Sequence, residues 1–129
     1  IITPHPAEFS RITGKTTEEI QKDRLTLAKS FAAEYGVTVV LKGVNTVIAS
    51  PDGMCMVNST GNAGLAKGGS GDVLTGIIAA LLAQGTPAPE AAVLGALLHQ
   101  KAGRIARTKM GAFSMLPSDV IDTLPQAFN

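Results

Sequence analysis

The sequence is poor in aromatic and cysteine residues. Aromatic side chains make up 4% of its 129 residues, with no Trp and one Tyr, so it lacks the stacking surfaces that bind single-stranded nucleic acids. Eleven Lys and Arg against ten Asp and Glu give a formal net charge of +1, too little to attract nucleic acid over a distance. Cys55 is the only cysteine. This excludes an internal disulfide and is typical of a reducing, cytoplasmic environment.

Long apolar runs are also absent. Residues 77–83 form the longest one, far short of the roughly 20 residues that cross a bilayer, so we expect no membrane partner. Hydrophobic residues nevertheless make up 45% of the chain, enough for the core of one domain. The chain begins with Ile1 in a β-prone segment rather than with Met. We therefore expect a fragment whose preceding strands are missing.

The order of apolar and turn-forming residues predicts an α/β domain with a mixed sheet. Glycine, proline and capping residues mark the ends of most elements. Strands are expected at residues 1–3 and 37–41, followed by a hairpin of residues 46–50 and 54–58 around a Pro-Asp-Gly turn. Helices are expected at residues 6–14, 16–36, 72–83, 89–107 and 117–124.

A glycine-rich segment, residues 58–72, joins the hairpin to the apolar helix that follows. Glycine lets the backbone approach a ligand closely, and the first N–H groups of a helix have no partner within it. Together these features predict an anion site that needs no cationic side chain. The spacing of the glycines matches neither the P-loop motif nor the dinucleotide-binding motif.

Asp72 stands where this segment enters the helix. A carboxylate beside a phosphate is repulsive unless it accepts a proton from an attacking hydroxyl or holds Mg²⁺ through water. Phosphoryl transfer needs such a base together with N–H donors. The alternative is that Asp72 only stabilises the helix N-terminus, where acidic residues are common. His99, inside a helix, and Cys55, inside a strand, are expected to be structural.

Residues 68–76, Gly-Gly-Ser-Gly-Asp-Val-Leu-Thr-Gly, resemble the signature of ADP- or ATP-dependent NAD(P)H-hydrate dehydratases. The resemblance extends over nearly the whole chain through four further motifs. These motifs are residues 3–8, 41–46, 58–62 and 116–121. It implies a ribokinase-like, three-layer α/β/α fold with a mixed, mainly parallel sheet. Residues 1–129 would be the C-terminal half of that single domain, because enzymes of this family are about twice as long.

The resemblance also implies a reaction and the residues that perform it. NADHX or NADPHX, the hydrated cofactors, would be dehydrated with ADP or ATP as co-substrate and Mg²⁺, through phosphorylation of the hydrate hydroxyl. Asp72 would be the catalytic base and contact the substrate, as would His5 and Asn62. Thr60 is a further candidate for the substrate pocket, although loop capping is an alternative for Thr60 and Asn62 alike. The residues expected to bind the nucleotide are Lys42, Gly43, Val44, Asn45, Thr46, Gly69, Ser70 and Gly71. A homotetramer is implied as well.

Two other functions remain open from the sequence. One is a kinase of the same superfamily acting on a vitamin-precursor alcohol, in which Gly71 and Asp72 would keep their roles. The segment 58–62 and His5 favour the dehydratase, because they belong to the substrate side. The other is a nucleotide-binding domain without catalysis, which a shortened chain makes plausible.

Overall fold

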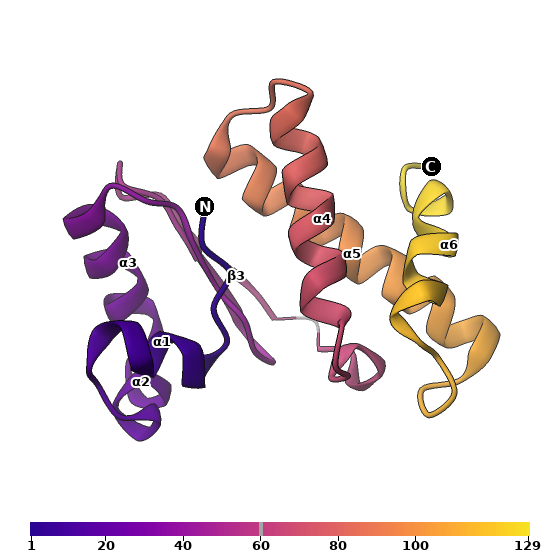
Figure 1. The fold of residues 1–129 in the computed structure, drawn as a ribbon, viewed down its shortest axis with the longest axis horizontal. Coiled ribbons are helices and arrows are strands. Elements are labelled where there is room, and N and C mark those ends of the chain that lie inside the picture. The colour runs from indigo at the N-terminus through magenta and orange to yellow at the C-terminus, as the bar shows by residue number, and fades with distance from the viewer. Residues whose placement is uncertain (60) are drawn as a thin grey trace. The chain divides into compact units, whose positions relative to one another are not determined.

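The computed structural model describes residues 1–59 and 61–129. The chain divides into two compact units, of which the first is Ile1–Ser59 and the second continues to Asn129. The first unit contains three helices and a sheet, whereas the second is helical (Figure 1). The site residues expected from the sequence are divided between these two units.

Two capping boxes begin the helices of the first unit. His5 caps α1 (Pro6–Thr13) together with Glu8, and Thr16 caps α2 (Thr17–Lys22) together with Glu19. The expectation of one helix over residues 16–36 is wrong, because Asp23 takes φ −146° and ψ 55° and separates α2 from α3 (Arg24–Tyr35). Aspartate competes with the backbone for hydrogen bonds and is a poor residue inside a helix. The break makes Arg24 the first residue of α3.

The sheet of the first unit has three strands in the order β1 (Val39–Leu41), β2 (Thr46–Ala49) and β3 (Cys55–Asn58). The predicted hairpin is confirmed, and both neighbouring pairs are antiparallel. Ile2 forms a parallel bridge with Val39. The sheet is therefore mixed, but among the described residues the parallel share is smaller than expected. Short turns join β1 to β2 and β2 to β3, and such turns connect only antiparallel neighbours.

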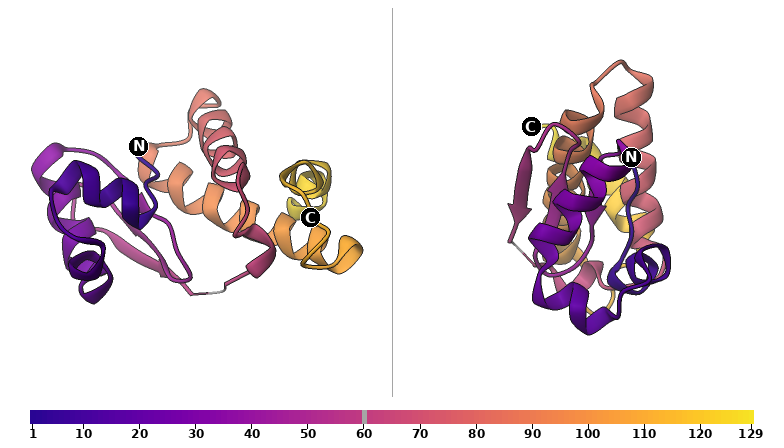
Figure 2. Two further views of the ribbon diagram at one scale, coloured as in Figure 1. Left: turned by 60° about the horizontal axis from the view of Figure 1, so that its bottom comes forward. Right: turned by 90° about the vertical axis from the view of Figure 1, so that its left-hand side faces the viewer.

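The core of the first unit lies between the helices and one face of this sheet (Figure 2). Alternate strand residues point to opposite faces, and Val39, Leu41, Val47 and Ala49 share the face that packs against the helices. Phe9 and Ala28 are fully buried against them. All three residues of β1 are buried, as predicted for a strand covered on both faces.

In the second unit the short 3₁₀ helix η1 (Ala63–Leu65) precedes three α-helices. These are α4 (Ser70–Ala83), α5 (Ala88–Met110) and α6 (Pro117–Ala127), each somewhat longer than predicted. The central helix α5 packs against both α4 and α6 (Figures 1 and 2). Ile77 of α4, Leu98 of α5 and Val120 of α6 belong to one shared apolar core. Over residues 1–59 and 61–129, no helix combines the length and apolar character that a bilayer crossing requires.

Candidate functional site

His5 and Lys42 are brought to the same edge of the sheet in the first unit. The N-terminal segment runs parallel to β1, and Val40 N–H donates to Ile2 O over 2.8 Å while Lys42 N–H donates to Pro4 O over 2.9 Å. His5 follows the end of this segment and Lys42 follows the end of β1. In α/β proteins, ligands gather at the carboxyl ends of such strands. The parallel pairing therefore supports the prediction that both residues border a site.

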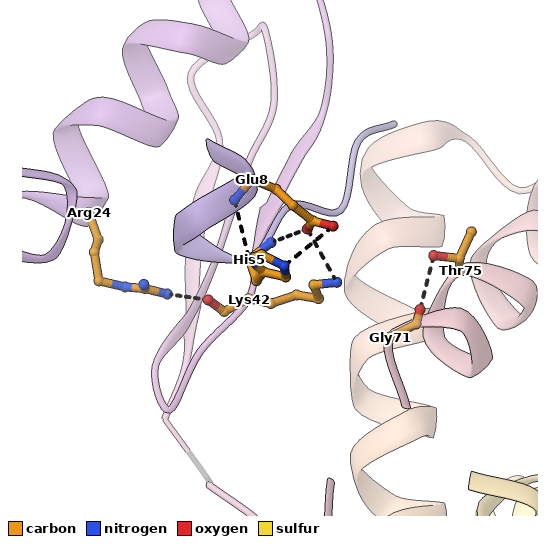
Figure 3. Close-up of polar contacts among 6 residues, drawn as sticks. All are labelled: His5, Glu8, Arg24, Lys42, Gly71 and Thr75. Atoms are coloured by element: carbon orange, nitrogen blue, oxygen red, sulfur yellow. Dashed lines mark hydrogen bonds and ion pairs between the residues drawn. The ribbon is translucent and has the colours of Figure 1, made fainter. Parts of the chain in front are cut away.

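The His5 side chain caps helix α1. Its Nδ1 accepts the N–H of Glu8 over 3.2 Å, and the Glu8 carboxylate accepts the N–H of His5 over 2.7 Å (Figure 3). Because Nδ1 is an acceptor, the neutral ring carries its proton on Nε2, which lies 3.5 Å from Glu8 Oε1. About half of each side chain is exposed, 49% for His5 and 46% for Glu8. The capping role and a role at the ligand are thus compatible.

Glu8 links His5 to Lys42. Its Oε2 lies 3.9 Å from Lys42 Nζ, the long end of the range for an ion pair (Figure 3). The hydrogen bond from His5 N–H is the largest effect on the pKa of Glu8 and lowers it. Burial opposes this shift, whereas the positive charges of Lys42 and Arg11, and of His5 when its ring is protonated, add to it. A negatively charged Glu8 therefore holds the Lys42 ammonium at this edge. An arriving phosphate would compete with Glu8 for that ammonium.

The 42–46 loop connects β1 to β2 and contains five of the predicted nucleotide-binding residues. Gly43, Val44 and Asn45 are exposed, and Thr46 Oγ1 donates to Gly43 O over 3.1 Å. Arg24, from the start of α3, donates to the carbonyl groups of this loop. The sequence analysis missed Arg24. No local pattern identifies it, because its partners are backbone oxygens 17 to 21 positions along the chain.

In the second unit Asn62 caps η1. Its Oδ1 accepts the N–H of Gly64 over 3.0 Å, which is the capping role that the sequence left open. The Nδ2 group is buried and has no hydrogen-bond partner among the described residues. This amide is the part of Asn62 that remains to meet a ligand. Thr60 lies outside the described residues.

Gly69 and Gly71 supply unused backbone donors at the start of α4. Gly69 is the N-cap and has φ 91°, a backbone conformation that favours glycine. The first amides of α4 are partly used, since Ser70 N–H donates to Lys67 O, and Asp72 and Val73 N–H donate to Gly69 O. Within residues 61–129, the N–H groups of Gly69 and Gly71 donate to no acceptor. The α4 terminus thus keeps two donors for an anion.

The Ser70 hydroxyl is not one of those donors. The residue is 4% exposed, and its Oγ lies 3.2 Å from Nε2 of His99 on α5. His99 is itself largely buried and holds Ser70 against α5, as its expected structural role requires. Any contact of Ser70 with a ligand through its hydroxyl requires this hydrogen bond to be replaced.

Lys67, directly before the glycine pair, is also occupied. Its Nζ donates to Phe113 O over 2.7 Å and to Met115 O over 2.6 Å, which ties the glycine-rich segment to the loop between α5 and α6. Gly69 lies beside the first residue of α6, because a Cβ added to Gly69 would stand 3.2 Å from Cγ of Pro117. Lys67 therefore stabilises the shape of the predicted anion site and leaves the anion to backbone N–H groups.

Asp72 is exposed, in the first turn of α4. Its carboxylate forms no hydrogen bond or ion pair with the residues that the structure describes, and its N–H is bonded to Gly69 O. A carboxylate packed among side chains, out of reach of the substrate hydroxyl, could not serve as the base of the reaction. Asp72 is instead available next to the free N–H of Gly71, whose carbonyl accepts the hydroxyl of Thr75 over 3.0 Å (Figure 3).

Residues that could hold a metal ion on their own are not clustered. Among the described residues, no group of three or more His, Cys, Asp or Glu side chains lies close enough together. Mg²⁺ is commonly bound by one or two carboxylates and the phosphates of a nucleotide. A magnesium ion here would need such phosphates among its ligands.

Comparison with known proteins identifies the family of this chain. A model of the family described as NAD(P)H-hydrate dehydratase matches residues 1–126. An ADP-dependent (S)-NAD(P)H-hydrate dehydratase of Neisseria meningitidis is 52% identical over 111 residues, which are 86% of this chain and 38% of that protein.

Two solved structures are similar in fold. One is the ADP/ATP-dependent NAD(P)H-hydrate dehydratase of Bacillus subtilis, co-crystallised with ATP and Mg²⁺, with a TM-score of 0.92 and 42% identity over 98% of this chain and 46% of that one. The other is a ribokinase-like superfamily protein of Enterococcus faecalis, with a TM-score of 0.80 and 34% identity over 96% of this chain and 42% of that one. The expected ribokinase-like α/β class is thereby confirmed. This chain spans less than half the length of these relatives and belongs to the NAD(P)H-hydrate dehydratase family.

Proposed function

We propose that this chain forms the C-terminal part of a domain that dehydrates NADHX or NADPHX at the expense of ADP or ATP. The observation that carries the proposal is the exposed Asp72 carboxylate beside the free Gly71 N–H, within a chain that a dehydratase family model matches over residues 1–126. The pairing provides the two groups that phosphoryl transfer needs, a base and donors for developing charge.

In the proposed reaction Asp72 takes the proton of the hydrate hydroxyl. The hydroxyl oxygen forms a bond to the terminal phosphorus of the nucleotide, and the bond from that phosphorus to the bridging oxygen breaks. The N–H groups of Gly69 and Gly71 stabilise the charge on the transferred group. The carbon–oxygen bond of the phosphorylated hydrate then breaks as the carbon–carbon double bond forms, releasing inorganic phosphate and a proton. NADH or NADPH remains.

The other site residues have binding roles in this proposal. His5 and the free Nδ2 of Asn62 contact the hydrated cofactor, and Lys42 offers its ammonium to the nucleotide in competition with Glu8. The backbone of the 42–46 loop borders the nucleotide. Mg²⁺ would bind together with the nucleotide phosphates. We also propose that the full-length protein is a homotetramer and is cytoplasmic.

The test uses the full-length protein with hydrated NADH, Mg²⁺ and either ADP or ATP. We expect the absorbance of NADH to return, and inorganic phosphate to appear in equal amount. Asp72→Asn should lower the turnover rate roughly 10²–10⁴-fold, the usual contribution of a general base, while the nucleotide Kd stays close to that of the wild type. Asp122→Asn, the same change at an exposed position on α6, is the matched control. Undiminished turnover in Asp72→Asn would contradict the role of this base, and a stable phosphorylated product without NADH would indicate a kinase.

A further inference from the structure

Arg24 lies behind the 42–46 loop. From the first position of α3, its Nη2 donates to the carbonyl oxygens of Leu41 over 3.0 Å, Lys42 over 3.1 Å and Asn45 over 2.9 Å. Figure 3 shows the guanidinium directed at the Lys42 carbonyl. Nη2 carries two hydrogens, so three acceptors share them. One guanidinium nitrogen thus fixes both ends of the loop.

The second nitrogen, Nη1, is held from the other side. Like every nitrogen of a guanidinium it only donates hydrogen bonds, and its acceptor is Oε1 of Gln21 on α2 at 3.0 Å. The break at Asp23 separates Gln21, on α2, from Arg24, the first residue of α3. Burial lowers the pKa of Arg24, yet a guanidinium keeps its charge at neutral pH. The loop is therefore fastened to two helices through a permanently charged group.

These bonds determine which way the loop amides point. In a trans peptide the C=O and the following N–H point in opposite directions. The pattern is visible at the start of the loop, where Leu41 O accepts from Arg24 and Lys42 N–H donates away from it, to Pro4 O. By the same geometry, the Lys42 carbonyl turned toward Arg24 directs the N–H of Gly43 away. That N–H donates to no acceptor in the described part of the chain.

Gly43 is shaped by Arg24 as well. Its φ is +155°, and a Cβ added there would stand 2.8 Å from Nη2 and 3.2 Å from Cζ of Arg24. A real Cβ does not approach a neighbouring atom at the shorter of these distances. Close approach of the guanidinium therefore explains why a glycine stands at this position.

We infer that Arg24 is a positioning residue for nucleotide binding. It draws the carbonyl at the end of β1 and two carbonyls of the loop inward, away from an incoming phosphate. The Gly43 N–H and the exposed side chains of the loop are left facing outward. The inference rests on the proposed function, since it assumes that the 42–46 loop borders ADP or ATP. Without Arg24, the carbonyl oxygens are free to turn outward, where their partial negative charge repels phosphate.

The test measures nucleotide binding and loop order separately. In the full-length protein, Arg24→Met should raise the Kd for ADP and for ATP roughly tenfold or more, because hydrogen bonds to a charged group are the strong ones. Hydrogen exchange of the 42–46 loop, measured without nucleotide, should become faster. Arg24→Lys keeps the charge and some donors but not the fork, and should lie between Arg24→Met and the wild type. If Arg24→Met does not fold, Arg24→Lys provides the measurement of nucleotide binding in its place.

Two controls separate positioning from general stability. Arg107→Met makes the same chemical change at an exposed position on α5, and should leave the Kd within about twofold, as surface substitutions usually do. Ala28→Gly weakens α3 itself at a buried position and leaves Arg24 unchanged. If Ala28→Gly raises the Kd as much as Arg24→Met at an equal loss of Tm, the inference is overturned.

The remaining outcomes distinguish the inference from the proposed function. A wild type that binds ADP or ATP, together with an unchanged Kd in both Arg24 variants, overturns the inference and leaves the proposed function standing. A wild type that binds neither nucleotide overturns the proposed function and the inference with it. A raised Kd with a KM for hydrated NADH near the wild-type value supports the assignment of Arg24 to the nucleotide loop.

Discussion

Gly69→Ala is expected to destabilise the second unit. Gly69 is the N-cap of α4 with φ 91° and ψ −19°, and an L-residue in the left-handed region costs about 1–2 kcal/mol. The new Cβ would also stand 3.2 Å from Cγ of Pro117, closer than ordinary van der Waals contact. We expect the free energy of unfolding to fall by at least the backbone cost, because α6 must give way as well.

The matched control is the same substitution later in the same helix. Gly76 lies in the middle of α4, where an added Cβ would meet nothing within 4 Å. Alanine is favoured over glycine inside a helix by about 0.5–1 kcal/mol. Gly76→Ala should therefore raise the free energy of unfolding. The two substitutions add the same methyl group to the same helix with opposite expected signs.

Equilibrium urea unfolding, followed by circular dichroism, measures both changes. The slope of free energy against urea should stay constant, so that a shift in the midpoint reports stability alone. Nucleotide binding provides a second reading, because a shift of Gly69 moves one of the two free donors at the α4 terminus. A Gly69→Ala protein as stable as Gly76→Ala would refute the left-handed cap on which the anion site depends.

Two further predictions concern the two units separately. Because hydrogen bonding lowers the pKa of Glu8 in the folded state, its stabilising effect is present above the ordinary carboxyl pKa and is lost as the pH falls through the lowered value. Glu8→Gln should therefore be less stable than the wild type at neutral pH, and urea unfolding should show this difference shrinking below pH 4.5; a constant difference would contradict it. Ser70→Ala removes the buried hydrogen bond between Ser70 Oγ and His99 Nε2 and should cost about 0.5–1.5 kcal/mol, whereas the exposed Ser114→Ala should change stability by less than about 0.5 kcal/mol.

Features set by neighbouring residues could be predicted from the sequence. The capping box of Thr16 and Glu19 spans three positions, and the hairpin follows from a turn motif between two β-prone runs. A helix after the glycine pair is also predicted locally, although from residue 72 rather than from Ser70, where α4 begins. In each case the partners lie within a few residues, so their pattern is visible without knowledge of the fold.

Features set by distant residues could not be predicted. The break at Asp23 separates two helices whose apolar residues follow one helical pattern, and it accompanies an Arg24 bound to carbonyls that any residue type could supply. Ser70 and His99 meet across 29 positions. No role was predicted for Arg24, because backbone acceptors leave no trace in the side-chain pattern. Separate roles were predicted for Ser70 and His99, because their contact depends on how α4 and α5 pack.

The use of positive charge in the two units leads to one conclusion about anion binding. Arg24 donates to carbonyls of the 42–46 loop, and Lys67 donates to carbonyls of the loop between α5 and α6. Both cations lie next to predicted nucleotide-binding residues, yet both donate hydrogen bonds to backbone carbonyl groups. The donors left for phosphate are then mainly amides, those of Gly43, Gly69 and Gly71. Amides impose direction on a bound anion without adding net charge, so the phosphate binding that we propose is compatible with a net charge of only +1.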